Sequence, residues 1–325
     1  MKSKQSLLST ILSLALALSL CLGLTACGDK GGDDAAYTVG ICQLAQHEAL
    51  DAATQGFMDA LNEALPGQVK FENKNASGDS ANCSTIVNGF VSEGVDLIMA
   101  NATGALTAAA SATSDIPILG TSITAYGVAL DIADFSGTVG GNISGTSDLA
   151  DLSKQADMIT EWFPETKTVG LLFCSAEPNS RYQIEEVAKN LSAKGIETRE
   201  FAFTDSNDVT AVTQAAAEYS DVVYIPTDNI AASNTEAIGN VLIPAGVPAI
   251  CGEAGICKGC GVATLSISYY DLGVTTGKMA AKILTGEASI SEMPIEYTDA
   301  TPKYNASVCD ALGIAPLDGY TAIED

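Results

Sequence analysis

Eight short apolar runs, separated by longer stretches with helical periodicity, recur from residue 37 onward and restrict the fold most. Most of them lack hydrophobic and polar alternation, which is typical of parallel strands covered on both faces. The predicted strands are Tyr37–Cys42, Val69–Glu72, Val95–Ala100, Ile116–Gly120, Thr168–Phe173, Glu197–Phe201, Val222–Ile225 and Val247–Ile250. Repetition of strand and helix predicts an α/β doubly wound fold.

A segment rich in Gly, Ser and Thr between residues 120 and 150 interrupts this series once. We therefore expect two Rossmann-like lobes that are joined near Asn142–Ser147. The late apolar runs Val262–Ser268 and Met293–Tyr297 flank a helical stretch, Leu272–Leu284, and indicate further crossings between the lobes. The predicted division is residues 37–146 plus 267–293 for lobe one, and residues 147–266 plus 294–325 for lobe two.

The N-terminus has the pattern of an export signal. Lys2 and Lys4 precede an apolar stretch that closes on Leu24-Thr25-Ala26-Cys27, which resembles a bacterial lipobox. We expect a lipoprotein signal peptide over residues 1–26, lipid on Cys27, and a flexible tether over residues 27–36. An uncleaved membrane anchor and a plain cleaved signal are the alternatives. The lipoprotein interpretation places the chain on the outer face of the cell membrane.

Charge and cysteine content limit the function further. The net charge of −25 repels nucleic acid, so nucleic-acid partners are excluded. Seven cysteines follow Cys27, and an odd number cannot all pair internally. For Cys257 and Cys260, a disulfide, a metal site and free thiols all remain open, although the last is favoured and no metal is predicted.

Motifs of catalysis and cofactor binding are missing. The chain has one histidine and contains no Gly-x-Ser-x-Gly elbow, no phosphate-binding Gly-x-x-x-x-Gly-Lys-Ser/Thr loop and no His-Glu-x-x-His. No Gly-x-Gly-x-x-Gly follows the first predicted strand, which argues against a dinucleotide. We therefore predict a protein without catalytic residues and without a cofactor.

Polar residues follow the predicted strands, where ligands bind in doubly wound sheets. Hydroxyls and amides suit a ligand carboxylate, directed toward Thr103, Thr121 and Thr124, and a carboxylate such as Asp228 or Glu253 suits an ammonium. A zwitterionic amino acid fits this set. Many of these residues are also ordinary helix N-caps. The candidate ligand-binding residues are Gln43, His47, Thr103, Gly104, Thr121, Thr124, Asp148, Asn179, Ser180, Thr227, Asp228, Asn229, Glu253 and Ser268.

Several segments, in order, resemble the substrate-binding lipoproteins of one ABC importer family, which has tryptophan- and tyrosine-binding members. They include Val39–Leu44, His47–Asp51, Gly145–Asp148, Glu177–Ser180, Pro226–Asn229, Gly252-Glu253 and Ser268–Gly273. The resemblance covers nearly all of residues 37–300. Tyr126-Gly127 departs from it, because many members carry Asp-Pro there.

The resemblance implies the type I periplasmic binding protein fold, in which a three-crossover hinge joins two lobes. It also implies that the chain, expected to be a monomer, delivers a small ligand to a membrane permease driven by a separate ATPase. The family narrows the expected ligand to an aromatic amino acid. An outer-face sensor or adhesin, and a receptor for a nucleoside or a sugar, are the alternatives.

Overall fold

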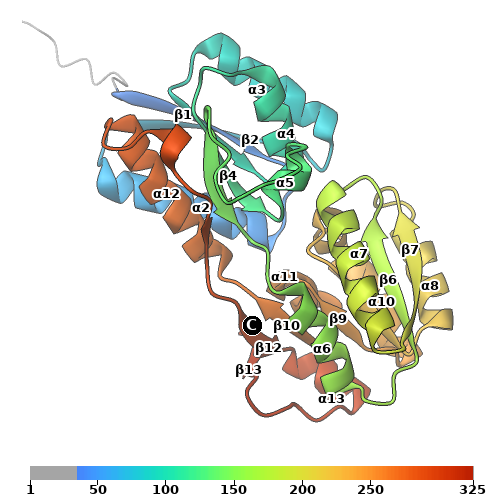
Figure 1. The fold of residues 1–325 in the computed structure, drawn as a ribbon. Coiled ribbons are helices and arrows are strands. Elements are labelled where there is room, and N and C mark those ends of the chain that lie inside the picture. Colours follow the sequence, from blue (N-terminus) through green and yellow to red (C-terminus); the bar gives the residue numbers. More distant parts are fainter. Residues whose placement is uncertain (1–34, 325) are drawn as a thin grey trace, which may run out of the picture. The chain divides into compact units, whose positions relative to one another are not determined.

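The computed structural model describes residues 35–324, which form two α/β lobes, each built on its own sheet (Figure 1). The signal peptide, Cys27 and most of the expected tether lie outside these residues. All strands of the first sheet are parallel. Its strand order is β11 (Glu296–Tyr297), β5 (Ile143–Ser147), β4 (Ile118–Ile123), β3 (Leu97–Asn101), β1 (Tyr37–Gln43) and β2 (Val69–Asn75).

The inner strands β3, β4 and β5 of this sheet are buried on both faces, whereas the edge strands β2 and β11 are largely exposed. In β3, Ile98 and Ala100 belong to one hydrophobic core, whereas Leu97 and Met99 belong to a second. This alternation follows from the two-residue period of a strand. The helices of this lobe are α2 (Glu48–Ala64), α3 (Ser80–Glu93), α4 (Thr103–Ala112), α5 (Tyr126–Ala129) and α12 (Tyr269–Leu284).

Helices α2 and α12 pack closely on one face of the first sheet. The predicted apolar face of α2 is buried at Leu50, Phe57 and Leu61, but Ala64 is exposed. Glycines allow the close approach: a Cβ atom on Gly273 would lie 2.0 Å from the carbonyl oxygen of Ala53.

We expect Gly273→Ala to destabilise the protein, because the two helices must separate to accept the new methyl group. The free energy of unfolding should fall by about 1–3 kcal/mol, as for other overpacked sites. Urea denaturation measures it. Gly89→Ala is the matched control, since Gly89 lies inside α3 and a methyl group added there would have no atom within 4 Å. That change should stabilise the helix by about 0.5–1 kcal/mol, and an equal loss in both variants would contradict the packing argument.

The second sheet is parallel except where β10 meets β12, which run antiparallel. In β6, alternate residues again enter two cores, with Leu171 and Phe173 on one side and Leu172 and Cys174 on the other. The strand order is β13 (Thr321–Ala322), β12 (Thr301–Tyr304), β10 (Ala263–Ser266), β9 (Ala249–Cys251), β8 (Val222–Ile225), β6 (Thr168–Cys174) and β7 (Glu197–Phe203).

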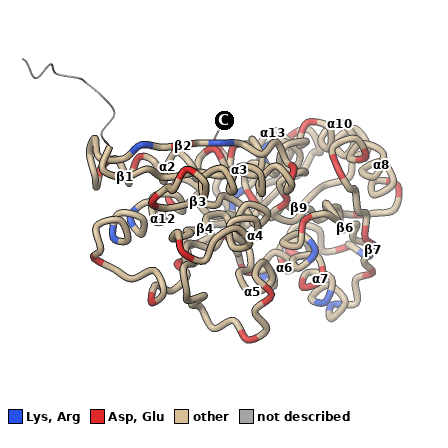
Figure 2. The backbone as a smooth tube through the Cα atoms, turned by 90° about the horizontal axis from the view of Figure 1, so that it is seen from above, with Lys and Arg blue, Asp and Glu red and all other residues tan. Residues whose placement is uncertain are grey.

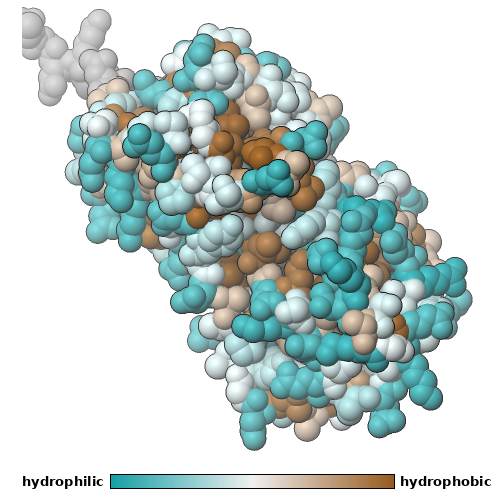
Figure 3. Space-filling view, in the orientation of Figure 1, coloured by the Kyte–Doolittle hydropathy of each residue, from teal (hydrophilic) through white to brown (hydrophobic). Residues whose placement is uncertain are grey.

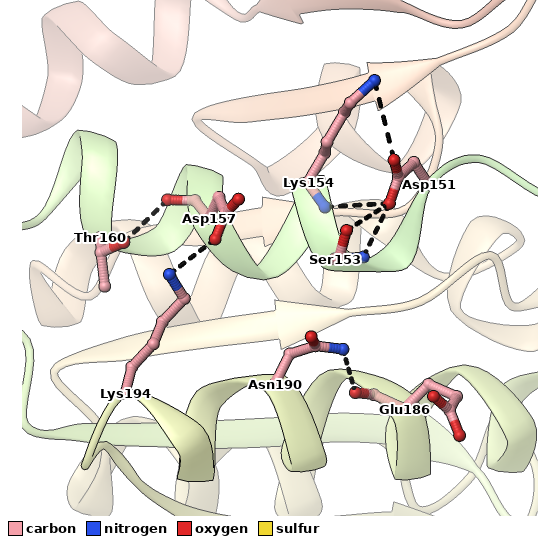
Figure 4. A network of polar contacts seen from close by, with 8 residues as sticks. All are labelled: Asp151, Ser153, Lys154, Asp157, Thr160, Glu186, Asn190 and Lys194. Carbon is pink, nitrogen blue, oxygen red and sulfur yellow. Dashed lines mark hydrogen bonds and ion pairs between the residues drawn. The ribbon is translucent and has the colours of Figure 1, made fainter.

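On the surface of this lobe an ion pair joins the neighbouring helices α6 and α7. Lys194, which ends α7, reaches Asp157 of α6 at 2.6 Å, and Asp151 caps α6 through the amides of Ser153 and Lys154 (Figure 4). The helices of the lobe are α6 (Leu152–Trp162), α7 (Pro178–Ala193), α8 (Val209–Tyr219), α9 (Asn229–Ala232), α10 (Thr235–Ala245), α11 (Ala254–Cys260) and α13 (Ala306–Leu312); a 3-10 turn, Ile290–Glu292, follows α12.

The chain passes between the two sheets three times: after β5, between β10 and α12, and between β11 and β12. Two predicted details are wrong. Residues 143–147, expected at the junction, form β5 inside the first sheet. Glu296 and Tyr297, expected in lobe two, pair with β5 as strand β11 of the first sheet. Residues 143–147 are mostly polar, so the sequence pattern did not indicate a strand there. Because β11 pairs with this strand, the third crossing follows β11 and comes later in the chain than expected.

Candidate functional site

A small polar cavity lies where the strand ends of the two sheets meet, and we call it the central cavity. Its volume is about 10 Å³, close to the minimum needed for one water molecule. A ligand of amino-acid size therefore enters only when the surrounding groups move apart. The lining residues are His47, Leu50, Ser122, Thr124, Asp148, Asn179, Thr227, Asp228, Asn229, Ala232, Glu253 and Tyr269.

Most of the residues predicted from strand ends are brought together here. The predicted residues that line the central cavity are His47, Thr124, Asp148, Asn179, Thr227, Asp228, Asn229 and Glu253. They come from both lobes, which agrees with a site formed between the two sheets. The predicted residues outside the lining are Gln43, Thr103, Gly104, Thr121, Ser180 and Ser268.

Bonds within the fold occupy several of the residues that lie outside. The Gln43 amide donates to Asp51 and to the Ala45 carbonyl, while its oxygen accepts the hydroxyl of Thr54. The hydroxyl of Thr121 pairs with that of Thr146 at 3.2 Å.

The other four residues outside the lining belong to helix starts. Ser268 caps α12 by accepting the amide of Asp271. Thr103 and Gly104 begin α4, where Gly104 lies against Leu44 and Ser80. Ser180, in the first turn of α7, accepts a hydrogen bond from Asn179. Ser268 is therefore a helix N-cap, which was the alternative to ligand binding for these polar residues.

Ser122 lines the cavity and was not predicted as a ligand contact. It sits in a β-bulge, because β4 has one more residue than β5 between the pairs Gly120–Gly145 and Ile123–Ser147. Its φ of 56° is in the left-handed region, which is strained for serine. Its buried hydroxyl has no hydrogen-bond partner. A β-bulge next to a functional site often changes the direction of a side chain. Here the bulge places an unpartnered hydroxyl in the wall of the cavity.

Asp148 supplies the second unpartnered group of the cavity. It follows β5 on the first crossing and is 5% exposed. Its Oδ2 accepts the hydroxyl of Tyr269 at 2.9 Å, whereas its Oδ1 is buried without a partner. Burial raises the pKa of this carboxyl above its usual range. An unpaired buried carboxylate is costly, so Oδ1 is a ready acceptor for a ligand donor.

Asp228 and Glu253 have the opposite character, because backbone amides already occupy their oxygens. Asp228 accepts the amides of Ala231 at 2.8 Å and Cys174 at 2.6 Å. Glu253 accepts the amides of Gly255 and Ile256 at the start of α11. Both predicted ammonium partners are therefore structural caps whose carboxylates are engaged in this arrangement.

The buried carboxyls make stability depend on pH. Burial raises the pKa of Glu253 from 4.5 to about 7, and burial with the nearby Asp228 raises that of Glu177 to about 7. Between these values the folded protein binds more protons than the unfolded chain, so the free energy of unfolding falls as pH rises.

From these two carboxyls we expect the free energy of unfolding of the ligand-free protein to be largest below about pH 4.5. It should then fall as the pH rises to about 7. Glu253 contributes at most about 3 kcal/mol. Denaturation at fixed pH values measures the slope, which Glu253→Gln should reduce. The exposed Glu185→Gln is the control for removing a surface charge. A slope unchanged by Glu253→Gln would contradict the assignment.

Two contacts cross between the lobes beside the cavity. His47, before α2, is 3.2 Å from the side-chain oxygen of Asn229 at the start of α9. Burial lowers the pKa of His47, although the bond to Asn229 acts in the opposite direction. Lys258 of α11 pairs with Glu48 of α2 at 3.7 Å. These two contacts bridge the walls of the cavity, although an exposed ion pair such as that between Lys258 and Glu48 adds at most about 1 kcal/mol.

A second, larger cavity of about 510 Å³ adjoins the first at Thr124. Its lining includes four aromatic side chains, those of Tyr126, Phe135 and Tyr297 from the first lobe and Tyr182 from α7. Figure 3 shows hydrophobic surface in the region of α5, which borders this cavity. It contains few of the predicted strand-end groups, so the central cavity remains the candidate site.

All seven cysteines of the described residues are free thiols, and all are buried. Cys257 and Cys260 are thus not joined in a disulfide. No group of three or more potential metal-ligating side chains occurs within residues 35–324.

The fold and the cavity define a two-lobed binding protein, and comparison with known proteins agrees. A family model described as "ABC transporter substrate binding protein" matches residues 38–315. The tyrosine-binding protein of Clostridioides difficile strain R20291 is 30% identical over 314 residues, which cover 92% of this chain and 89% of that protein.

Two solved structures are also similar. The ABC domain in complex with L-Trp from Streptococcus pneumonia is 28% identical with a TM-score of 0.83, covering 88% of this chain and 99% of that one. The ligand-free, open structure of a substrate binding protein with adhesive properties from Clostridium difficile is 32% identical with a TM-score of 0.67, covering 89% and 99%.

This chain belongs to the family of ABC transporter substrate-binding proteins. Its two lobes have the architecture of type I periplasmic binding proteins, as the resemblance implied. Family membership makes it a binding protein rather than an enzyme, working outside the cytoplasm with the components of an ABC transporter.

Proposed function

We propose that the chain captures an aromatic amino acid in the central cavity. The observation that carries this proposal is the pair of unpartnered buried groups, Ser122 Oγ and Asp148 Oδ1, which line the same cavity. The ligand ammonium bonds Asp148, and its carboxylate accepts the hydroxyl of Ser122. The ligands named for the tyrosine-binding relative and for the L-Trp complex support the aromatic class.

The remaining lining residues suit an aromatic side chain. Leu50 and Ala232 contribute apolar side chains to the lining, and His47 and Tyr269 contribute rings. Aromatic rings gain about 0.5–1.5 kcal/mol from such pairs beyond the burial of their area. These groups lie on both lobes, so one ring contacts both walls once the walls have moved apart far enough to admit it.

Binding in this proposal requires opening and closure of the lobes. The chain resembles the L-Trp complex more closely than the ligand-free, open structure, with TM-scores of 0.83 and 0.67 at nearly equal coverage. This difference, with the cavity of about 10 Å³, favours a closed arrangement in the structure. A ligand that bonds both lobes shifts the population toward a closed form whose cavity is wider than the one described here.

Calorimetry on the purified chain tests the ligand class. L-Tryptophan or L-tyrosine should bind, whereas glucose, ribose and adenosine should not. Binding of a sugar or a nucleoside alone would overturn the assignment.

A sensor or an adhesin on the same fold is the second candidate, favoured by the adhesive properties stated for one relative. Absence of a neighbouring permease gene would support that candidate.

We also propose that Cys27 carries lipid and that the mature chain is a monomer on the outer face of the membrane. From there it delivers its ligand to a permease and an ATPase. The lipobox and the polar segment after it support the anchor. Within residues 35–324, no helix is long and apolar enough to cross a membrane. Cys27→Ala should abolish incorporation of labelled palmitate, while Cys21→Ala, inside the signal, should not. Equal labelling of both variants would exclude Cys27.

A further inference from the structure

The central cavity is acidic and has no cationic side chain to balance it. Asp148, Asp228 and Glu253 line it, and none of its lining residues is Lys or Arg. Burial keeps His47 toward its neutral form, since it lowers the pKa of the ring. Lys258, at the edge, is already paired with Glu48. Figure 2 shows the same imbalance along the described chain, where acidic residues far outnumber basic ones.

The backbone amides that usually hold a ligand carboxylate are also occupied. At the start of α9, Asn229 and Ile230 donate their amides to Glu177. At the start of α11, Gly255 and Ile256 donate to Glu253, and Ala254 donates to the hydroxyl of Ser266. At these two helix starts, the protein's own side chains thus take the backbone donors that a ligand carboxylate would otherwise accept.

Among the carboxyl oxygens that line the cavity, by contrast, one is free to accept a hydrogen bond. Asp148 Oδ1 is buried, unpartnered and part of the cavity wall. A ligand ammonium there forms a charge-assisted hydrogen bond, about twice as strong as a neutral one. Among the lining residues, the hydroxyl of Ser122 is the buried donor without a partner, and a ligand carboxylate that accepts it lies beside three carboxyl groups.

We propose that this site binds primary aromatic amines as a ligand class, with the ammonium required and the α-carboxylate dispensable. The inference rests on the proposed function for the location of the site and for the aromatic ring. It extends that function to ligands such as tyramine and tryptamine, which keep the ammonium and the ring of the corresponding amino acids and lack the carboxylate.

Calorimetry on the purified chain with matched ligands tests the proposal. Each set contains the amino acid, its amine and its deaminated acid: tyrosine, tyramine and 3-(4-hydroxyphenyl)propionate, or tryptophan, tryptamine and indole-3-propionate. The amine should bind within about 10-fold of the amino acid, because the hydroxyl bond that it loses is offset by the removal of a negative charge from a cavity lined by three carboxyl groups. The deaminated acid should bind about 30-fold to several-thousand-fold more weakly.

The outcomes separate the two proposals. If an amino acid binds and its amine is more than about 100-fold weaker, this inference fails and the proposed function stands. If the amines bind and neither amino acid does, the proposed function fails and the inference stands. Binding of no member overturns both. A deaminated acid as tight as its amino acid overturns the inference, and so does an Asp148→Asn variant that keeps full affinity for tyramine.

Discussion

Asp148→Asn is expected to weaken binding of tryptophan or tyrosine by about 30-fold to several-thousand-fold, because the ligand ammonium loses a buried charged partner. Asparagine has nearly the same shape and still offers an oxygen to the hydroxyl of Tyr269, which bonds Asp148 at 2.9 Å. The fold should therefore survive, and calorimetry measures the loss of affinity directly.

The matched control for this variant is Asp151→Asn, three residues further along the same crossing. Asp151 is exposed and caps α6, a role that asparagine also performs well. It should bind ligand as tightly as the parent. Equal affinity of the Asp148→Asn variant and the parent would show that the ammonium lies elsewhere, whereas a parallel loss in both variants would indicate a general effect of charge on this segment.

Much of the fold could be predicted because most of its strands are apolar on both faces. Val222–Ile225 is an observed strand with the predicted bounds. The strand β5 could not be recognised, because its sequence Ile143-Ser144-Gly145-Thr146-Ser147 is mostly polar. Tertiary contacts make that composition stable: Ser144 donates to the carbonyl of Met293, and Thr146 bonds Thr276. Residues distant in sequence supply these partners, so no local sequence pattern indicates the strand.

The location of the candidate site could be predicted, but the roles of its residues could not. Parallel strands end at one edge of a sheet, so polar residues after them converge. The direction of each side chain depends on register, and the bulge that turns Ser122 toward the cavity is a property of strand pairing. Tyr269 begins α12, far along the chain from the crossing that carries Asp148, and only the folded chain brings them together.

Carboxylates at strand ends look alike in sequence, yet the structure separates them by their partners. Asp148 keeps one oxygen free, whereas both oxygens of Asp228 accept backbone amides, one from α9 and one from β6. A substitution at Asp228 therefore acts first on the fold, and loss of ligand binding in such a variant is no evidence of contact with the ligand.

Asp228→Ala is expected to lower the free energy of unfolding by about 2–6 kcal/mol, because it leaves the buried amides of Cys174 and Ala231 without acceptors, at about 1–3 kcal/mol each. Urea denaturation of the ligand-free protein measures the change.

Asp228→Asn separates this structural role from a charge effect at the same position. It keeps an oxygen for one of the two amides and removes the repulsion that raises the pKa of the neighbouring Glu177. Its loss of stability should therefore be clearly smaller than that of the alanine variant. If Asp228→Ala is as stable as the parent but no longer binds ligand, Asp228 contacts the ligand directly, and the assignment of the ammonium to Asp148 must be given up.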